Sequence, residues 1–188
     1  MLSVWSGDRF RPTRDLDLLG YGDTSQEALA EVFRSICAEA VPDDGVVFDI
    51  EGLKAAVIRE ETEYGGVRIR TTATIGDARI PVQVDVGCGD AITPGPVQIE
   101  YPTLLGFPAP YLKVYPVETI VAEKLETLVV LGMANSRVKD YYDLVLVSRM
   151  FGFELCTLAE AVRRTFERRG TPVPASTPIG LTDGFAAV

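Results

Sequence analysis

Alternating hydrophobic and polar residues predict β-strands in the first half of the chain. The segments 67–75 and 78–86 place a hydrophobic residue at nearly every second position, as expected for strands with one buried face. A Gly-Asp pair separates the two segments, so we expect a β-hairpin with a two-residue turn. This turn sets Asp85 opposite Arg68. Shorter strands are predicted at 46–48, 55–59 and 97–99.

Two aspartates lie two residues apart in the segment 13–20, which precedes the hairpin. In a strand, Asp15 and Asp17 share one face, with their Cβ atoms about 6–7 Å apart. Leu16 and Leu18 then point into a core. Two carboxylates this close repel each other unless a positive group lies between them. A Mg²⁺ ion with oxygen ligands meets this need, and simple solvation of both acids at a strand end is the alternative.

The acid on the second hairpin strand has two interpretations. Asp85 completes a group of three acids with Asp15 and Asp17 if the first strand lies beside the hairpin. Alternatively, Asp85 forms a cross-strand ion pair with Arg68, worth less than about 1 kcal/mol if exposed. The polar face of the hairpin also carries basic residues that suit an RNA backbone, with a solvated strand face as the alternative. These residues are Arg68, Arg70 and Arg79.

Hydrophobic residues at helical spacing predict four helices, beginning near residues 24, 116, 136 and 155. The first opens with the pattern Thr24-x-x-Glu27, which is typical of a capping box. The second opens with Pro116, a residue favoured in the first turn of a helix. A Gly- and Pro-rich connector at 87–116 separates the strands from these later helices. The chain is therefore predicted to be an α+β protein.

One lysine lies inside the apolar stripe of the second predicted helix. Lys124 must snorkel, form an ion pair or point into a polar cavity, whereas Glu123 and Glu126 lie away from the stripe. Asp140 and Asp143 are three residues apart and share a face of the next helix. The helix dipole accounts for an acid in the first turn, which explains Asp140 better than Asp143.

The composition excludes several classes of function. The chain has 188 residues, 47% of them hydrophobic, which suits one domain or slightly more. It has no apolar run of membrane-spanning length and no signal peptide, so we expect no membrane association. Three widely spaced cysteines predict a reducing cytoplasm. A net charge of -9 argues against nucleic-acid binding over the whole surface.

The chain contains no histidine, which excludes Ser-His-Asp and Cys-His catalysis and histidine-ligated zinc. No serine or cysteine has a base beside it in the sequence. Carboxylates with a single core-facing lysine favour metal-assisted phosphoryl or nucleotidyl transfer over hydrolysis through a covalent intermediate. This chemistry requires the acids near the start, the hairpin acid and Lys124 to line one cleft.

Three segments of the chain carry a resemblance to a known family. The sequences RPTRDLDLLG at 11–20, PVETIVAEKL at 116–125 and RVKDYYDL at 137–144 resemble the AbiEii-type abortive-infection nucleotidyltransferases. The resemblance covers about residues 2–187. It implies a polymerase-β-like nucleotidyltransferase fold, with a mixed sheet and flanking helices followed by a helical region. The corresponding domains are 1–115 and 116–188.

The resemblance also implies a function. Such a chain is the toxin of a type IV toxin–antitoxin system, and it transfers a nucleotide from a nucleoside triphosphate, GTP or CTP, to a target such as tRNA. Mg²⁺ is the implied cofactor and an AbiEi-type antitoxin the implied partner. The implied catalytic residues are Asp15, Asp17, Asp85, Lys124 and Asp140, with the first three as metal ligands. The implied nucleotide-binding residues are Arg14, Lys124, Lys139 and Asp143.

This sequence departs from the family pattern at its ends. Family members carry a Gly-Gly or Gly-Ser turn roughly ten or more residues before the aspartate pair, where backbone N–H groups bind phosphate. The sequence begins after that position and also stops early. Two alternatives therefore stay open: an inactive fragment that serves as an antitoxin-binding module, and a small-molecule nucleotidyltransferase of the aminoglycoside-modifying type.

Overall fold

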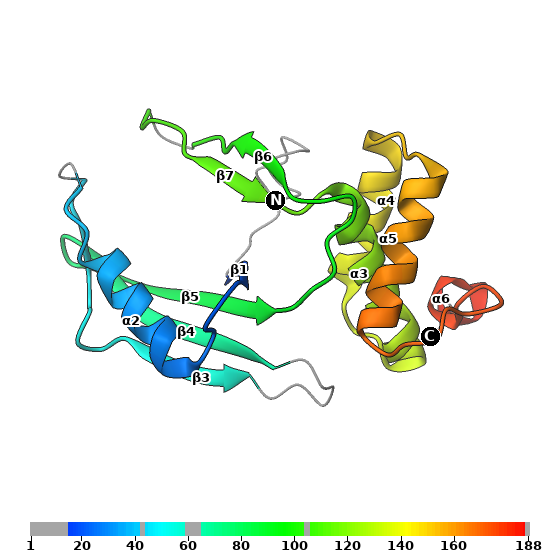
Figure 1. Cartoon of the computed structure of the whole chain (residues 1–188), viewed down its shortest axis with the longest axis horizontal. Coiled ribbons are helices and arrows are strands. Elements are labelled where there is room, and N and C mark those ends of the chain that lie inside the picture. Colours follow the sequence, from blue (N-terminus) through cyan, green and yellow to red (C-terminus); the bar gives the residue numbers. More distant parts are fainter. Residues whose placement is uncertain (1–14, 42–43, 59–64, 104–105, 187–188) are drawn as a thin grey trace. The chain divides into compact units, whose positions relative to one another are not determined.

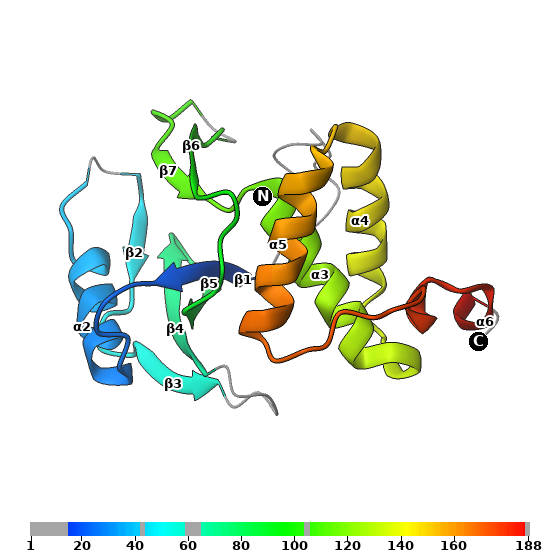
Figure 2. The ribbon, with the colours of Figure 1, turned by 45° about the vertical axis from the view of Figure 1, so that its right-hand side comes forward.

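The computed structural model describes residues 15–41, 44–58, 65–103 and 106–186. They form a mixed α+β structure that divides into two compact units, within Pro12–Asp90 and Ala91–Val188 (Figures 1 and 2). We describe each unit by itself. The units divide after Asp90, so that residues 91–115 group with the helices, and the sequence-based domain boundary at 115 stays a prediction.

The first unit is built on a five-stranded mixed sheet. Its strand order is β1-β5-β4-β2, and β3 also pairs with β4. β1 runs parallel to β5, whereas the other pairs are antiparallel. The predicted hairpin is confirmed, with Ile75 opposite Ala78 and Arg68 opposite Asp85. The strands are β1 Asp15–Gly20, β2 Val46–Phe48, β3 Lys54–Ile58, β4 Gly66–Ile75 and β5 Ala78–Cys88.

Helix α2, Gln26–Cys37, covers one face of this sheet (Figure 1). Its N-cap is Ser25, whose Oγ accepts the N–H of Ala28 at 3.3 Å. The predicted capping box at Thr24 is therefore wrong by one residue. The backbone N–H of Ser25 is itself bound by the side chain of Asp23, which fixes the turn before the helix. The hydrophobic core beneath α2 contains Leu29, Ala30, Leu53, Val67, Ile69, Val84 and Val86.

The two leucines of β1 are more exposed than the sequence predicted. Leu16 and Leu18 pair in register with Val84 and Val86 and so share their face of the sheet. They are nevertheless 56% and 41% exposed, so the prediction that they point into a core is wrong. The reason is their position, because β1 ends the strand order and α2 packs against β3 and β4.

The second unit contains a β-hairpin and a group of helices. β6 Val97–Glu100 pairs antiparallel with β7 Tyr111–Val114. The sequence predicted the first of these strands but assigned the second to a connector. The helices are α3 Val117–Leu131, α4 Val138–Met150, α5 Leu155–Arg168 and α6 Asp183–Ala186, with short 3-10 turns η1 Gly132–Ala134 and η2 Ile179–Leu181.

Helix α3 packs against both α5 and α4, and the three helices lie side by side (Figure 2). The sequence predicted an apolar stripe on this helix at Val117, Ile120, Val121, Leu125, Leu128 and Leu131. Of these residues Leu128 is fully buried, and Thr119 and Ala122 outside the stripe are fully buried too, because neighbours cover the helix on more than one side. Its N-cap is Pro116, one position before the predicted first turn. None of the described helices has the length and apolar character required to cross a bilayer.

A buried acid on α3 corrects another expectation. Glu126, predicted to lie away from the core, is 6% exposed. Its carboxylate accepts hydrogen bonds from Arg169 at 2.9 Å and from Thr171 at 2.6 Å. Arg169 follows α5, so this group ties the end of α5 to the middle of α3. A buried carboxylate is tolerated here because a cation and a hydroxyl replace the water it loses.

Candidate functional site

Three charged residues lie side by side across three adjacent strands of the sheet. Asp17 on β1 is the register partner of Asp85 on β5, and Asp85 is the register partner of Arg68 on β4. Register partners on neighbouring strands point to the same face of a sheet. We call this arrangement the Asp17–Asp85–Arg68 row. It occupies the face opposite to the core residues Val84 and Val86.

Asp85 and Arg68 form a two-pronged ion pair. Nε of Arg68 donates to Oδ1 of Asp85 at 2.7 Å, and Nη2 donates to Oδ2 at 2.6 Å. The Asp85 side chain is 18% exposed and that of Arg68 is 32% exposed. The cross-strand ion pair considered from the sequence is thus present. The placement of β1 directly beside Asp85, which the three-acid interpretation required, is present as well.

A second row of polar residues, Asp15, Gln83 and Arg70, lies beside the first on the same face, and its central residue is neutral where the first row has Asp85. Gln83 is the register partner of Asp15, and its Oε1 accepts the Nε–H of Arg70 at 2.9 Å. Asp15 is described only in its backbone, and Arg14, predicted to bind nucleotide, lies outside the described residues. Arg68 and Arg70 thus have partners within the sheet, whereas Arg79 is exposed, and RNA binding by this face stays a prediction.

The donor chemistry of the row fits a hard divalent cation. Mg²⁺ prefers carboxylate oxygens and uses one or two protein carboxylates together with substrate phosphates. Asp17 is exposed, and Asp85 lies at the same level on the adjacent strand. Asp85 fits this role once Arg68 releases one of its oxygens. The side chains that the structure describes contain no cluster of three metal-ligating residues, and the predicted third ligand, Asp15, is not among these side chains.

A second charged group lies among the helices. Nζ of Lys124 on α3 contacts the carboxylate of Asp140 and lies 2.9 Å from Oδ2 of Asp143, both on α4. Nε of Arg137 lies 3.1 Å from Oδ2 of Asp140. We call these four residues the Lys124 cluster. Of the three environments predicted for Lys124, the ion pair is the one observed. Asp140 and Asp143 share a helix face, as predicted.

Burial distinguishes the Lys124 cluster from an ordinary surface ion pair. The side chain of Asp143 is fully buried at 0% exposure, and Lys124 is 18% exposed. Two cations and two carboxylates compensate one another, which makes their burial tolerable. An ammonium group has three N–H donors, and the two acids take two of them. Within the described residues, one donor of Lys124 is therefore left for an added acceptor such as a phosphate oxygen.

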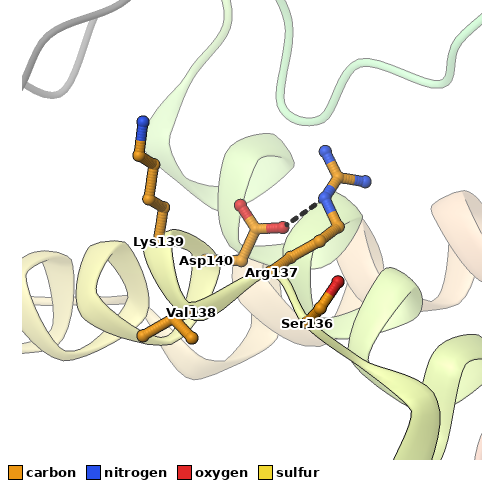
Figure 3. Close-up of a pocket in the computed structure, with 5 residues that line it drawn as sticks. All are labelled: Ser136, Arg137, Val138, Lys139 and Asp140. Carbon is orange, nitrogen blue, oxygen red and sulfur yellow. Dashed lines mark ion pairs between the residues drawn. The ribbon is translucent and has the colours of Figure 1, made fainter.

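A pocket of about 440 Å³ lies at the start of α4. It is lined by Ser136, Arg137, Val138, Lys139 and Asp140. Figure 3 shows the guanidinium of Arg137 turned toward Asp140, whereas the ammonium of Lys139 points away from this pair. Exposed cations at the N-terminal end of a helix attract anions, since the helix dipole adds to their charge. This end of α4 thus has the chemistry to bind phosphate.

The sequence singled out the acids of the row and the members of the Lys124 cluster, but it missed the partners of Glu126. A usable signal is the spacing of Thr119, Ala122 and Glu126, because steps of three and four residues set Glu126 on the same helix face as two other buried residues. The two charged groups lie in different units, so the common cleft expected for the acids and Lys124 stays a prediction.

The mixed α+β fold and the acidic and basic groups described above are compatible with a nucleotidyl transferase. The model of the family described as "Nucleotidyl transferase AbiEii toxin, Type IV TA system" matches residues 1–186, and the chain belongs to this family. Membership implies a nucleotide substrate and an antitoxin partner. No curated protein and no solved structure matches the chain.

Proposed function

We propose that this chain transfers a nucleotide from a nucleoside triphosphate to a target molecule, with the Asp17–Asp85–Arg68 row at the centre of the reaction. The observation that carries the proposal is the register of β1 and β5, because it brings Asp17 and Asp85 to one level on one face of the sheet. The proposal includes a polymerase-β-like arrangement of this sheet. Family membership supports the reaction class.

In this proposal Asp15, Asp17 and Asp85 hold a divalent cation. When bound, Mg²⁺ supplies positive charge to the triphosphate and favours ionisation of the attacking hydroxyl. Asp17 presents its carboxylate to solvent, where a metal-bound triphosphate has access to it. Asp85 supplies a second carboxylate to the cation from the neighbouring strand β5. When no cation is bound, Arg68 compensates Asp85, and the charge of Asp17 repels the triphosphate, which makes binding dependent on the metal.

The Lys124 cluster and the start of α4 provide the basic half of the proposed chemistry. Lys124 neutralises negative charge that develops on the phosphates, and Asp140 and Asp143 hold its ammonium in place. We also assign Lys139 and Arg14 to nucleotide binding.

We assign GTP or CTP as the nucleotide and tRNA as the target, with an AbiEi-type antitoxin as the neutralising partner. A reaction that consumes nucleoside triphosphates and modifies tRNA takes place in the cytoplasm. The exposed Asp17 and the absence of histidine-based chemistry support a metal-assisted reaction on phosphates.

The test is transfer of label from α-³²P GTP or CTP to total tRNA in the presence of Mg²⁺. Wild-type protein is compared with Asp17→Asn and with Asp77→Asn, a matched control at an exposed aspartate in the turn of the same hairpin. We expect transfer by the wild type and by Asp77→Asn. We expect Asp17→Asn to lose about 100-fold or more, since a metal ligand contributes several kcal/mol of transition-state stabilisation.

Two outcomes would contradict the proposal. Equal activity of Asp17→Asn and wild type would show that the Asp17–Asp85–Arg68 row takes no part in the reaction. Failure of the folded wild type to label tRNA with any of the four nucleoside triphosphates would favour an inactive antitoxin-binding module. Protection of cells against aminoglycosides, without labelling of tRNA, would instead favour a small-molecule nucleotidyltransferase.

A further inference from the structure

We propose that Arg68 is a positioning residue that competes with the divalent cation for Asp85, so that it holds this carboxylate in place when no metal is bound and releases one oxygen when the metal binds. The inference rests on the proposed function, because it assumes that Asp85 faces a metal site. It assigns to Arg68 a role that neither the sequence pattern nor family membership gives to this residue.

The first step of the argument is geometric. Both oxygens of Asp85 are engaged by Arg68, at 2.7 Å and 2.6 Å. This fork-to-fork contact fixes the plane of the carboxylate as well as its position. On its other side Asp85 faces Asp17, its register partner on β1. A cation bound between the two aspartates therefore has to share Asp85 with the guanidinium.

The second step concerns energy. The pair is partly exposed, with 18% and 32% of the two side chains accessible, so its strength is limited by solvent. A divalent ion carries twice the charge of the guanidinium and takes carboxylate oxygens as its preferred ligands. The metal can therefore replace one of the two hydrogen bonds at a low cost in free energy, whereas the second hydrogen bond keeps the carboxylate oriented. The competition with Arg68 weakens the binding of the metal.

The third step is a comparison within the same sheet face. Arg70 is two residues further along β4 and projects to the same side as Arg68. It donates to Gln83, a neutral side chain, at 2.9 Å. Loss of Arg70 removes the same charge from the same face, but among the side chains that the structure describes it frees no carboxylate. Arg70 is therefore the matched control that separates competition for Asp85 from a general electrostatic effect.

The experiment measures Mn²⁺ binding by the loss of the electron paramagnetic resonance signal of the free ion, at constant pH and salt. We expect Arg68→Gln to lower the dissociation constant about three- to fivefold relative to wild type, the upper part of the range that corresponds to an ion pair of this exposure. Arg70→Gln should stay within about twofold of wild type, because its effect is limited to screened charge. Asp17→Asn should weaken binding and so locate the ion at the row.

A second pair of variants tests the same competition if Arg68→Gln does not fold. Arg68→Lys retains the charge but offers a single point of contact, and we expect about twofold tighter Mn²⁺ binding, against no change in Arg70→Lys. Thermal unfolding followed by circular dichroism checks each variant. Tightening in Arg68→Gln but not in Arg70→Gln supports the competition.

The outcomes separate this inference from the proposed function. Mn²⁺ binding that depends on Asp17 but is equal in Arg68→Gln and Arg70→Gln would overturn the inference and leave the proposed function standing. Mn²⁺ binding by the wild type that does not respond to Asp17→Asn would overturn the metal site itself. Weaker binding in Arg68→Gln than in wild type would mean that the guanidinium only orders Asp85 and does not compete.

Discussion

The two units use ion pairs in opposite ways. In the Lys124 cluster one ammonium is shared by two carboxylates, and the side chain of Asp143 has no contact with solvent. In the Asp17–Asp85–Arg68 row one carboxylate is held by one guanidinium at a partly exposed position, next to an exposed acid. The types of residue are similar, but their access to water differs.

This difference decides what each group is able to do. A buried charge that loses its partner has no water to replace it, so the Lys124 cluster is strongly coupled to folding. A partly exposed charge exchanges its partner at low cost, so the row is free to change partners when a ligand arrives. Substitutions in the row should therefore affect binding more than stability, and substitutions in the cluster should affect both.

The largest effect is expected when the cluster loses its shared cation. Lys124→Met leaves Asp140 with Arg137 and leaves Asp143 buried without its ammonium. We expect the free energy of unfolding to fall by about 3–5 kcal/mol. Arg68→Gln in the row should cost about 1 kcal/mol or less. Urea unfolding of both variants measures the contrast, and equal losses would show that burial does not separate the two groups.

The next effect concerns the buried acid that the sequence did not single out. Glu126→Gln keeps the shape of the side chain but removes the charge that Arg169 and the hydroxyl of Thr171 face. We expect a loss of about 2 kcal/mol in the free energy of unfolding, typical of a hydrogen bond to a charged group. Urea unfolding measures it. A loss below that of Arg68→Gln would contradict the assignment of Glu126 to the core of the helical unit.

A partial rescue should follow from removing the acid that Lys124→Met leaves behind. The double variant Lys124→Met/Asp143→Leu replaces a buried ion pair by two apolar side chains of similar size. We expect it to recover about 1–2 kcal/mol relative to Lys124→Met alone, because the buried carboxylate that has lost its ammonium is removed as well. A double-mutant cycle measures the recovery. Additive losses would mean that Asp143 is stabilised by groups other than Lys124.

The smallest effect is expected on the exposed side of α5. Arg163 donates to the carboxylate of Glu160, and this contact lowers the pKa of Glu160 below its ordinary value. Such a shift stabilises the folded chain above the ordinary pKa, and the contribution is lost as the pH falls through the lowered pKa. Because the pair is exposed, this contribution is small, and Arg163→Gln should change urea unfolding at neutral pH by no more than the error of the measurement. Titration by NMR should show the pKa of Glu160 rising toward its ordinary value.

Much of the local structure was predictable because it follows from short-range patterns. The period of two along 67–75 and 78–86 gave both hairpin strands and their register, including the pairing of Arg68 with Asp85. Helical spacing gave the start of each long helix to within a few residues. A lysine in an apolar stripe also required a partner, and Lys124 has two.

Contacts between distant segments were not predictable from the same patterns. Spacing alone did not say that β1 runs parallel to β5 or that Asp17 is the register partner of Asp85. It placed Leu16 and Leu18 in a core because alternation indicates a face but not whether a helix covers that face. It placed Glu126 outside the core because its partners, Arg169 and Thr171, lie far along the chain.

The sequence by itself thus determined the strands, the long helices, the acidic and basic residues on which the chemistry depends, and the family to which the chain belongs. The tertiary structure alone decided which acid meets which cation and how much water reaches each pair. The physical reason is that local periodicity acts over a few residues, whereas burial and ion pairing depend on chain segments that only folding brings together.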